Sequence, residues 1–320
     1  MYTHKDISLI IPTYNRAKDL QRTLASLKPH LSHIREVLII DQSSQDDTKK
    51  LITKIKKKNI HYYYSSTPSI TIARNLGVKK AAKQSRLICF LDDDVTLGKN
   101  YFDEILNVFN THSKAKAVAA YVLSTEKLPS KIENRIRKIF FISHTTENEA
   151  KIISAYGNTY PDHLDTTINA QWLPGVNMVY KKDVFKEQSF DENLLGYTVA
   201  EDIDFSYRLY KKNPQGLFIT PHAKLIHRIS TIERYPTEKI SYINQVDHFY
   251  FYFKNLHSNV LERVKFIWSL LGITLLRTLQ YLTTFSTKDK LKLKFYLASL
   301  GYCIKNIKEI KEGNLRNFFH

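Results

Sequence analysis

Short apolar runs that each end in a polar side chain or proline recur along the first third of the chain. They occupy residues 7–11, 37–40 and 87–91, and are followed by Pro12, Asp41 and Asp92. Runs rich in β-branched residues and leucine are typical of strands buried on both faces of a parallel sheet. Because parallel strands need a crossover connection between them, the segments between these runs are expected to be helices or other long connections.

The intervals carry helical patterns. Leu20, Leu24 and Leu27 follow helical spacing, residues 44–51 begin like a helix with early acidic residues, and a further helix is expected around residues 72–83. Additional strands are expected at residues 61–64 and 176–180, and the chain from residue 240 reads as helical. Strands alternating with helices predict an α/β fold with an open, mostly parallel sheet flanked by helices.

The polar residues after the strands are expected to meet. In open α/β sheets, ligands bind beyond the carboxyl ends of the strands. Pro12 and Tyr14 follow the first predicted strand, Asp41 ends the second, and Asp92 begins an acidic triplet after the fourth. The sequence therefore predicts a ligand site at this edge of the sheet.

Three aspartates come in the sequence Leu91-Asp92-Asp93-Asp94-Val95. Adjacent carboxylates repel one another unless a cation or several hydrogen-bond donors neutralise them. Their oxygen atoms suit Mg²⁺ or Mn²⁺, ions that also bind diphosphates. A solvated turn is the alternative, since aspartate is common in turns. The position at a strand end, with Asp41 ending another strand, favours a metal site.

Composition limits the partners and the compartment. The chain has 48 lysine and arginine residues against 31 acidic ones, a net charge of +17, which indicates an anionic partner. Cys89 and Cys303 are its two cysteines, so a disulfide framework is excluded and a reducing compartment is expected. No apolar run reaches the roughly 18 residues of a spanning helix, and the N-terminus is unlike a signal peptide. We expect a cytoplasmic protein that is peripheral on the inner face of the cell membrane.

The segment Ile7-Ser-Leu-Ile-Ile-Pro-Thr-Tyr-Asn-Arg16 resembles the opening strand of family 2 glycosyltransferases, which have the Rossmann-like GT-A fold. Four further stretches resemble the family in the same order, and they are Ile39-Ile-Asp-Gln-Ser-Ser44, Ala73-Arg-Asn-Leu-Gly77, Phe90-Leu-Asp-Asp-Asp94 and Glu201-Asp-Ile-Asp-Phe-Ser-Tyr-Arg208. Together they cover roughly residues 6–230. Single motifs are weak, but five in order make the resemblance specific.

The resemblance implies an inverting transferase that uses a nucleotide-sugar donor, most simply a UDP-sugar, and a divalent metal. Asp94 would hold the metal on the diphosphate, and His227 would be a further metal or phosphate ligand or else a structural histidine. The resemblance also implies a set of nucleotide-sugar-binding residues, which are Pro12, Tyr14, Asp41, Arg74, Asp92 and Asp93. For Arg74, an ion pair with Asp92 is an equal alternative.

The resemblance places the acceptor side in the second half of the chain. An inverting transferase needs a carboxylate to take the proton of the acceptor hydroxyl, and the resemblance gives this role to Asp202. Gly175 and Glu201 would lie on the acceptor side. Asp204 is expected to be a favourable acid at a helix N-terminus, and Arg208 to form a structural ion pair.

The C-terminal segment is basic. Residues 254–320 contain twelve basic and four acidic residues, a net charge of 12 − 4 = +8. The basic residues are Lys254, Arg263, Lys265, Arg277, Lys288, Lys290, Lys292, Lys294, Lys305, Lys308, Lys311 and Arg316. Aromatic residues, Phe266, Trp268 and Tyr296 among them, lie between these positions. Such helices bind anionic membrane interfaces, although packing against the catalytic domain with a solvated basic face is the alternative.

We expect a catalytic domain over residues 1–235, with a nucleotide-binding half to about 125 and an acceptor half over 126–235, and a helical basic extension over 236–320. The first functional hypothesis is a transferase in polysaccharide biosynthesis, with a lipid-linked or cell-envelope glycan as acceptor. The alternative is a nucleic-acid- or membrane-binding protein without transferase activity. The sequence has no nucleic-acid-binding motif, so the transferase is favoured and no nucleic-acid partner is expected.

Overall fold

The computed structural model describes residues 1–123, 129–230, 232 and 235–315. The chain forms two compact units, each assembled from segments that are distant in sequence. The sheet unit comprises Met1–Lys127, His163–Glu192 and Glu201–Glu233, and the helical unit comprises Leu128–Asp162, Asn193–Ala200 and Arg234–His320. None of the described helices combines the length and the apolar character needed to cross a bilayer.

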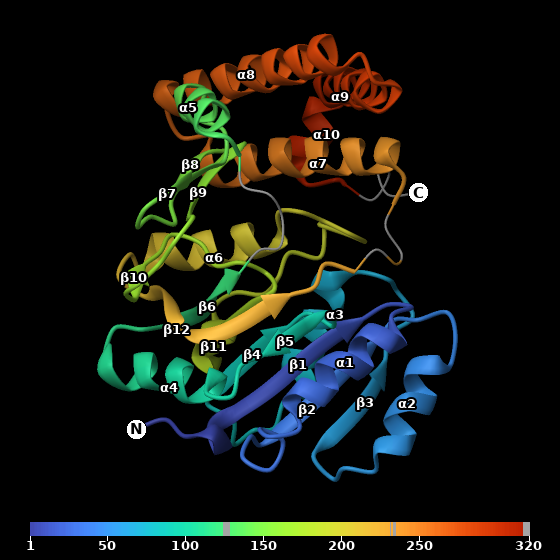
Figure 1. Cartoon of the computed structure of the whole chain (residues 1–320), viewed down its shortest axis with the longest axis vertical. Helices are drawn as coiled ribbons and strands as arrows, with labels where there is room; N and C mark the ends of the chain where they lie inside the picture. Colours follow the sequence, from blue (N-terminus) through green and yellow to red (C-terminus); the bar gives the residue numbers. More distant parts are fainter. Residues whose placement is uncertain (124–128, 231, 233–234, 316–320) are drawn as a thin grey trace. The chain divides into compact units, whose positions relative to one another are not determined.

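Four parallel strands form one half of the sheet, in the order β3-β2-β1-β4 (Figure 1). They are β1 (Ile7–Thr13), β2 (Glu36–Asp41), β3 (Ile60–Tyr64) and β4 (Leu87–Leu91). Every residue of β1, β2 and β4 is buried, which explains their continuous apolar sequences. The register pairs Thr13 with Asp41, so β1 and β2 end together. The four strands predicted in this part of the chain are confirmed.

Helices cover the sheet on both faces. They are α1 (Ala17–Leu27), α2 (Asp47–Ile55), α3 (Ile70–Lys80), α4 (Tyr101–Thr111) and α6 (Glu201–Lys212), with 3-10 turns η1 (His4–Asp6) and η2 (Lys182–Lys186). Leu9 of β1 belongs to the core that α1 and α4 complete. Its neighbour Ile10 faces α3, where a Cβ added to Gly77 would lie 2.4 Å from Cγ2 of Ile10. Only glycine allows α3 to approach β1 so closely.

The other half of the sheet is mixed, although most strands of the whole sheet run in one direction, as expected. β11 (Asn177–Lys181) lies antiparallel between β4 and β6 (Ala117–Leu123), and β12 (Leu217–His227) is parallel to β6. The short strands β5 (Val95–Leu97) and β10 (Ile168–Asn169) pair antiparallel with β12. The sequence predicted β11, at residues 176–180, but not the other strands of this half, because short strands and polar interruptions give weak periodicity.

The helical unit confirms the helical character expected after residue 240. Its elements are α5 (Lys131–Ile139), β7 (His144–Thr146), β8 (Ile152–Ser154), β9 (Gly157–Pro161), α7 (Thr237–Phe251), the π-helical segment η3 (Tyr252–Leu256), α8 (Val260–Thr284), α9 (Thr287–Lys305) and α10 (Ile307–Glu312). Phe266 stacks on Tyr252 with 4.0 Å between ring centroids, and Tyr296 is 3% exposed. Phe266 and Tyr296 are therefore interior residues.

The compact units divide the chain differently from the expected domains. Residues 128–162 and 193–200 group with the C-terminal helices, although the sequence suggested that they belong to the acceptor half. Contacts at the end of α5 contribute to this grouping: Nε1 of Trp268 donates to the carbonyl of Ile139 at 2.9 Å, and Phe140 stacks on Trp268. Whether the two units differ in function stays a prediction.

Candidate active site

The polar residues predicted to converge lie in the sheet unit, at the carboxyl ends of neighbouring strands. Thr13 and Asp41 are paired in register, and β4, the other neighbour of β1, leads directly into Asp92, Asp93 and Asp94. This arrangement follows from the parallel order of the strands, because their carboxyl ends share one edge of the sheet.

Asp92, Asp94 and His227 form one cluster, in which ligand atoms from the three side chains lie within 4.8 Å of one another. Topology explains how the distant histidine arrives there: β5 follows the acidic triplet, and its Val95 pairs with His227 at the end of β12. Oδ1 of Asp94 is 3.1 Å from Nε2 of His227. Two carboxylates and an imidazole are a donor set able to hold a divalent cation.

The environment of Asp94 fits a cation ligand. Its Oδ2 accepts the Ser230 amide at 2.8 Å, whereas its buried Oδ1 has no donor in hydrogen-bonding geometry among the described residues. Burial favours the neutral acid, but contacts with His227 and the Ser230 amide hold the pKa of Asp94 below its usual value. The residues present therefore suit a metal ion, with Asp94 charged and one oxygen available.

Asp93 has different surroundings from its two neighbours. Its Oδ2 accepts a hydrogen bond from the Thr13 hydroxyl at 2.6 Å, and its Oδ1 lies 3.5 Å from the Arg16 guanidinium. Only 4% of Asp93 is exposed. The contacts that the structure gives Asp93 thus tie the acidic triplet to the end of β1, and direct contact with a nucleotide stays a prediction.

Asp41 is held at the end of β2. Its carboxylate accepts the Ser43 amide at 3.0 Å and the Tyr62 hydroxyl at 2.9 Å, and the residue is 1% exposed. Pro12 is buried in β1, and Tyr14 is partly exposed just beyond the end of that strand. All three predicted nucleotide residues therefore lie at or near the same two strand ends.

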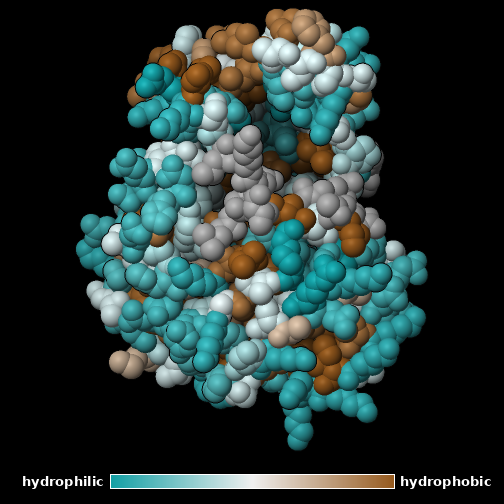
Figure 2. Space-filling model, in the orientation of Figure 1, coloured by the Kyte–Doolittle hydropathy of each residue, from teal (hydrophilic) through white to brown (hydrophobic). Residues whose placement is uncertain are grey.

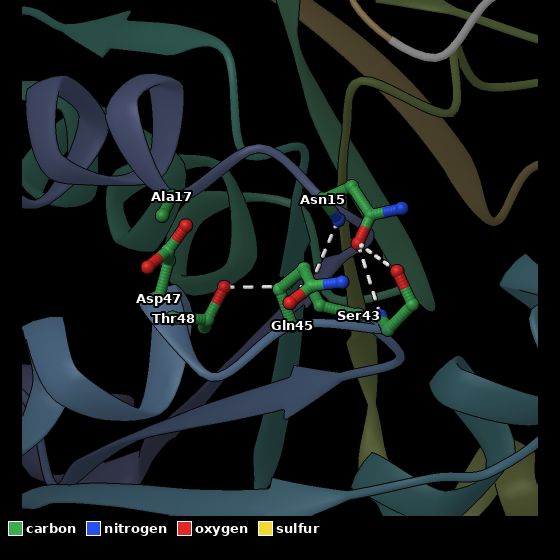
Figure 3. A pocket seen from close by; sticks show the side chains of 7 residues that line it. Asn15, Ala17, Ser43, Gln45, Asp47 and Thr48 are labelled. Carbon is green, nitrogen blue, oxygen red and sulfur yellow. Dashed lines mark hydrogen bonds between the residues drawn. The ribbon is translucent and has the colours of Figure 1, made fainter.

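A polar pocket of about 320 Å³ opens between the segments that follow β1 and β2 (Figure 3). Its lining comprises Asn15, Ala17, Ser43, Ser44, Gln45, Asp47 and Thr48. Asn15 connects the two segments. Its backbone amide donates to Oγ of Ser43 at 2.8 Å, and its side-chain Oδ1 accepts a hydrogen bond from the backbone amide of Ser44 at 3.0 Å. Asn15 adopts a left-handed φ of 53°, a conformation that asparagine tolerates better than most residues. Asn15, Ser43 and Ser44 lie within two of the quoted motifs, but the lining residues were not singled out from the sequence.

Arg74 on α3 is a buried cation surrounded by acids. Its guanidinium donates to Oε1 of Glu201 at 3.1 Å and to the Gly175 carbonyl at 3.0 Å, and lies 3.7 Å from Oδ1 of Asp92. Arg74 is 2% exposed. The ion pair that was the alternative for this residue is therefore present, and the guanidinium connects the acidic triplet to the start of α6. Contact with a nucleotide stays a prediction.

Glu201 and Asp202 begin α6, beside Gly175. Asp202 accepts the Gly175 amide on Oδ2 at 2.6 Å and the Ile203 amide on Oδ1 at 2.7 Å. A Cβ on Gly175 would lie 2.9 Å from Oδ2 of Asp202, so glycine permits this approach. Burial raises the pKa of both the Glu201 and Asp202 carboxyls, and the Arg74 guanidinium opposes the rise. Asp202 is partly exposed and fixed in orientation, as a proton acceptor should be.

On the same helix, Asp204 and Arg208 form the structural ion pair expected for Arg208, with Nη2 of Arg208 2.9 Å from Oδ2 of Asp204. Sequence reasoning missed two residues that support the acidic triplet, Arg16 beside Asp93 and Ser230 beside Asp94. Arg16 closes the first quoted motif, which was a usable signal. Ser230 has no local signal, because its role depends on where β12 ends.

Solved structures with low sequence identity share the fold. The structure of GalNAc-T7 with UDP, GalNAc and Mn²⁺ superposes with a TM-score of 0.59 at 14% identity, covering 94% of this chain and 57% of that chain. Structural neighbours of this kind are GT-A glycosyltransferases. The expected fold class, an α/β GT-A fold with a helical C-terminal part, is therefore confirmed.

Curated relatives match parts of the chain. An uncharacterised glycosyltransferase of Rickettsia felis is 29% identical over 211 residues, which are 66% of this chain and 31% of that protein. The minor teichoic acid biosynthesis protein GgaB of Bacillus subtilis is 25% identical over 194 residues, covering 59% of this chain and 19% of GgaB. The chain thus spans about a third or less of these two relatives. The family model of glycosyl transferase family 2 matches residues 8–189, and the chain belongs to that family.

Proposed function

We propose that the protein is an inverting, metal-dependent glycosyltransferase that moves a sugar from a nucleotide-diphosphate donor to an acceptor hydroxyl. The observation that carries this proposal is the cluster of Asp92, Asp94 and His227 at the strand ends, with Arg74 linking Asp92 to the start of α6. Family membership supports the class of reaction. In this arrangement one group of residues binds the diphosphate and a separate one, Asp202, meets the acceptor.

The metal, Mn²⁺ or Mg²⁺, would be held by Asp94 and His227, with Asp92 beside them. When bound, it supplies positive charge that stabilises the leaving diphosphate. The closeness of Oδ1 of Asp94 to Nε2 of His227 supports this role, because one cation could bind both atoms. The Mn²⁺ in the structure of GalNAc-T7 supports the choice of metal only by analogy of fold.

The nucleotide would bind across the ends of β1 and β2. Asp41 presents a buried carboxylate that already accepts two hydrogen bonds, and Tyr14 offers a partly exposed ring that could stack on a base. Pro12 would line the same pocket. Asp92, Asp93 and Arg74 would complete the donor site from β4 and α3. We propose a UDP-sugar as the donor, which the UDP in the GalNAc-T7 structure supports by analogy.

Asp202 would act as the general base. The acceptor hydroxyl must lose its proton as its oxygen attacks the anomeric carbon, while the bond from that carbon to the diphosphate breaks on the opposite side. Amide donors from Gly175 and Ile203 fix the carboxylate and keep it oriented. Its raised pKa makes it a better proton acceptor than an ordinary aspartate. Gly175 and Glu201 would lie on the acceptor side of this group.

We propose a lipid-linked or cell-envelope glycan as the acceptor. The teichoic acid biosynthesis protein GgaB among the relatives supports a role in polysaccharide synthesis. A lipid-linked acceptor would bring the protein to the inner face of the cell membrane, where we propose that it acts as a peripheral protein. The strongly basic composition supports an anionic partner of this kind.

Calorimetric titration with UDP-sugars and Mn²⁺ tests the proposal. Asp94→Ala should abolish metal-dependent donor binding, because it removes a charged ligand from the cluster. The fold should survive, since removing one of three adjacent carboxylates relieves repulsion.

Asp165→Ala is the matched control, because the Asp165 side chain is 81% exposed on the same unit and should leave binding unchanged. Unchanged Mn²⁺-dependent binding by Asp94→Ala would refute the metal role.

A further inference from the structure

The outward face of α8 is apolar. Val264, Ile267, Leu271, Leu275, Leu279 and Leu282 recur at steps of three or four residues, and each is between 42% and 58% exposed. This spacing places them on one side of the helix. Brown surface gathers over α8 and α9 at the top of the space-filling view (Figure 2). A continuous apolar stripe of this length on a surface helix marks an interaction site.

The opposite side of α8 packs through Phe266 and through small and polar residues. Ser269 and Gly272 are buried, and a Cβ on Gly272 would lie 2.3 Å from Cβ of Phe140. Ser269 donates to the hydroxyl of Ser154 at 3.0 Å, and the Arg277 guanidinium lies over the Tyr296 ring at 5.0 Å from its centroid. The helix therefore turns its leucines outward, the reverse of a surface helix that packs its apolar stripe on a core.

All exposed charged residues on α5, α8 and α9 are basic. They are Lys131, Arg135, Lys138, Arg263, Lys288, Lys290, Lys294 and Lys305. The acids of these three helices, whose residues are all described, are Glu133, Glu262 and Asp289, and none is exposed. Each pairs with a basic residue on its own helix, at N to O distances of 2.8, 2.8 and 3.1 Å. The apolar stripe is thus accompanied by uncompensated positive charge.

We propose that the α8 stripe, defined as the six apolar residues above, docks on an anionic phospholipid surface with the helix axis in the plane of the membrane. Leucine side chains enter the acyl boundary while lysine and arginine meet lipid phosphates. α8 has 25 residues, yet it is not apolar enough to span a bilayer, which suits a helix lying at the interface. The proposal deepens and rests on the membrane location suggested above, because it names the surface and the lipid class.

The charge around the α8 stripe distinguishes between three possible partners of this surface. A second copy of the same basic face would bring like charges together, which opposes self-association. A nucleic acid would match the charge but leave the leucines in water. An anionic lipid surface satisfies both the apolar stripe and the basic residues.

Co-sedimentation of the full chain with phosphatidylglycerol–phosphatidylcholine vesicles tests the proposal. The double variant Leu271→Ser, Leu275→Ser should bind at least about tenfold more weakly, because two side chains no longer leave water. The double variant Leu271→Met, Leu275→Met keeps the apolar area and should bind like the wild type. Leu271 and Leu275 are both exposed, so folding should be retained in both variants, which circular dichroism checks. UDP-sugar binding should be unchanged in the serine variant, which separates this test from that of the transferase.

Charge is tested with the same wild-type chain. Binding should weaken on pure phosphatidylcholine vesicles and in added salt, which screens the lysine and arginine residues. Equal vesicle binding by the serine and methionine variants would overturn the proposal. Equal binding to anionic and zwitterionic vesicles would overturn its lipid class. A dimer that the serine variant dissociates, in the absence of vesicle binding, would assign the stripe to a second copy and also overturn it.

Discussion

The sheet unit and the helical unit differ in the partners of their buried carboxylates and in the exposure of their apolar side chains. In the sheet unit, some buried acids meet a cation, as Asp93 meets Arg16 and Glu201 meets Arg74, although Asp41 accepts hydrogen bonds from neutral donors. In the helical unit, Asp247 on α7 is buried with neutral donors, the Thr198 hydroxyl at 2.6 Å and the Val199 amide at 2.9 Å. The helical unit also turns leucines toward solvent on α8. Charged partners thus recur around the strand ends of the sheet unit, whereas exposed apolar residues recur on α8 of the helical unit.

The sharpest test of this difference is the pH dependence of stability. Burial raises the pKa of Asp247 to about 6, from 3.8. Folding therefore favours the neutral form of Asp247. Its contribution to the free energy of unfolding is fully present below about pH 4 and is lost as the pH rises through about 6. Between these two pH values, the free energy of unfolding of the wild type should fall by about 3 kcal/mol relative to that of Asp247→Asn, whose side chain does not titrate. Urea unfolding of both proteins at about pH 4 and about pH 8 measures this change.

Asp6 in the sheet unit supplies the control with the opposite sign. Hydrogen bonds from Arg86, at 2.7 Å to each oxygen, lower the pKa of Asp6 to about 2. Its contribution is present above about pH 4 and is lost as pH falls through about 2, so the difference from Asp6→Asn should shrink on acidification. The same sign for Asp6 and Asp247 would contradict the contrast between these two carboxylates.

A smaller effect is expected from Gly175→Ala in the sheet unit. The new Cβ would meet Oδ2 of Asp202 at 2.9 Å and push the carboxylate from its position. Sugar transfer should fall by about tenfold, since small displacements of a catalytic group are costly. Gly301→Ala on α9 is the matched control, because a Cβ there meets nothing within 4 Å. Steady-state transfer rates of the two variants test the expectation, and equal rates would show that Gly175 is not needed for the position of Asp202.

Sequence patterns predicted the sheet unit well because its strands are short, buried and continuous. The ends of the parallel strands could be located from Thr13, Asp41 and Asp92, and their register then places them at one edge. Ser230 could not be found, since its contact with Asp94 depends on the pairing of β5 with β12. The alternation of strands and helices therefore allowed most of the site to be predicted. The contacts that depend on pairing between strands distant in sequence could not be predicted.

The helical unit was harder to predict in detail. Periodicity shows that residues lie on one side of a helix but not which side is buried. α8 has apolar residues on both sides, and the small residues Ser269 and Gly272 decide that its leucines face outward. The aromatic residues Phe266 and Tyr296 lie between basic residues of the tail in the sequence, and both are interior in the structure. Arg316, counted with those basic residues, lies outside the described residues.

The central claim is that Asp202 takes the acceptor proton, and Asp202→Asn tests it most directly. The measurement is sugar transfer beside donor affinity, with Asp204→Asn as the control on the same helix. The acceptor hydroxyl would attack unassisted in Asp202→Asn, so turnover should fall by about 10²–10⁴-fold while UDP-sugar affinity is retained. In the wild type, the acidic limb of the rate should lie above pH 3.8, because the raised pKa of Asp202 sets where the base is lost. Full turnover by Asp202→Asn, or loss of turnover in Asp204→Asn alone, would contradict the account.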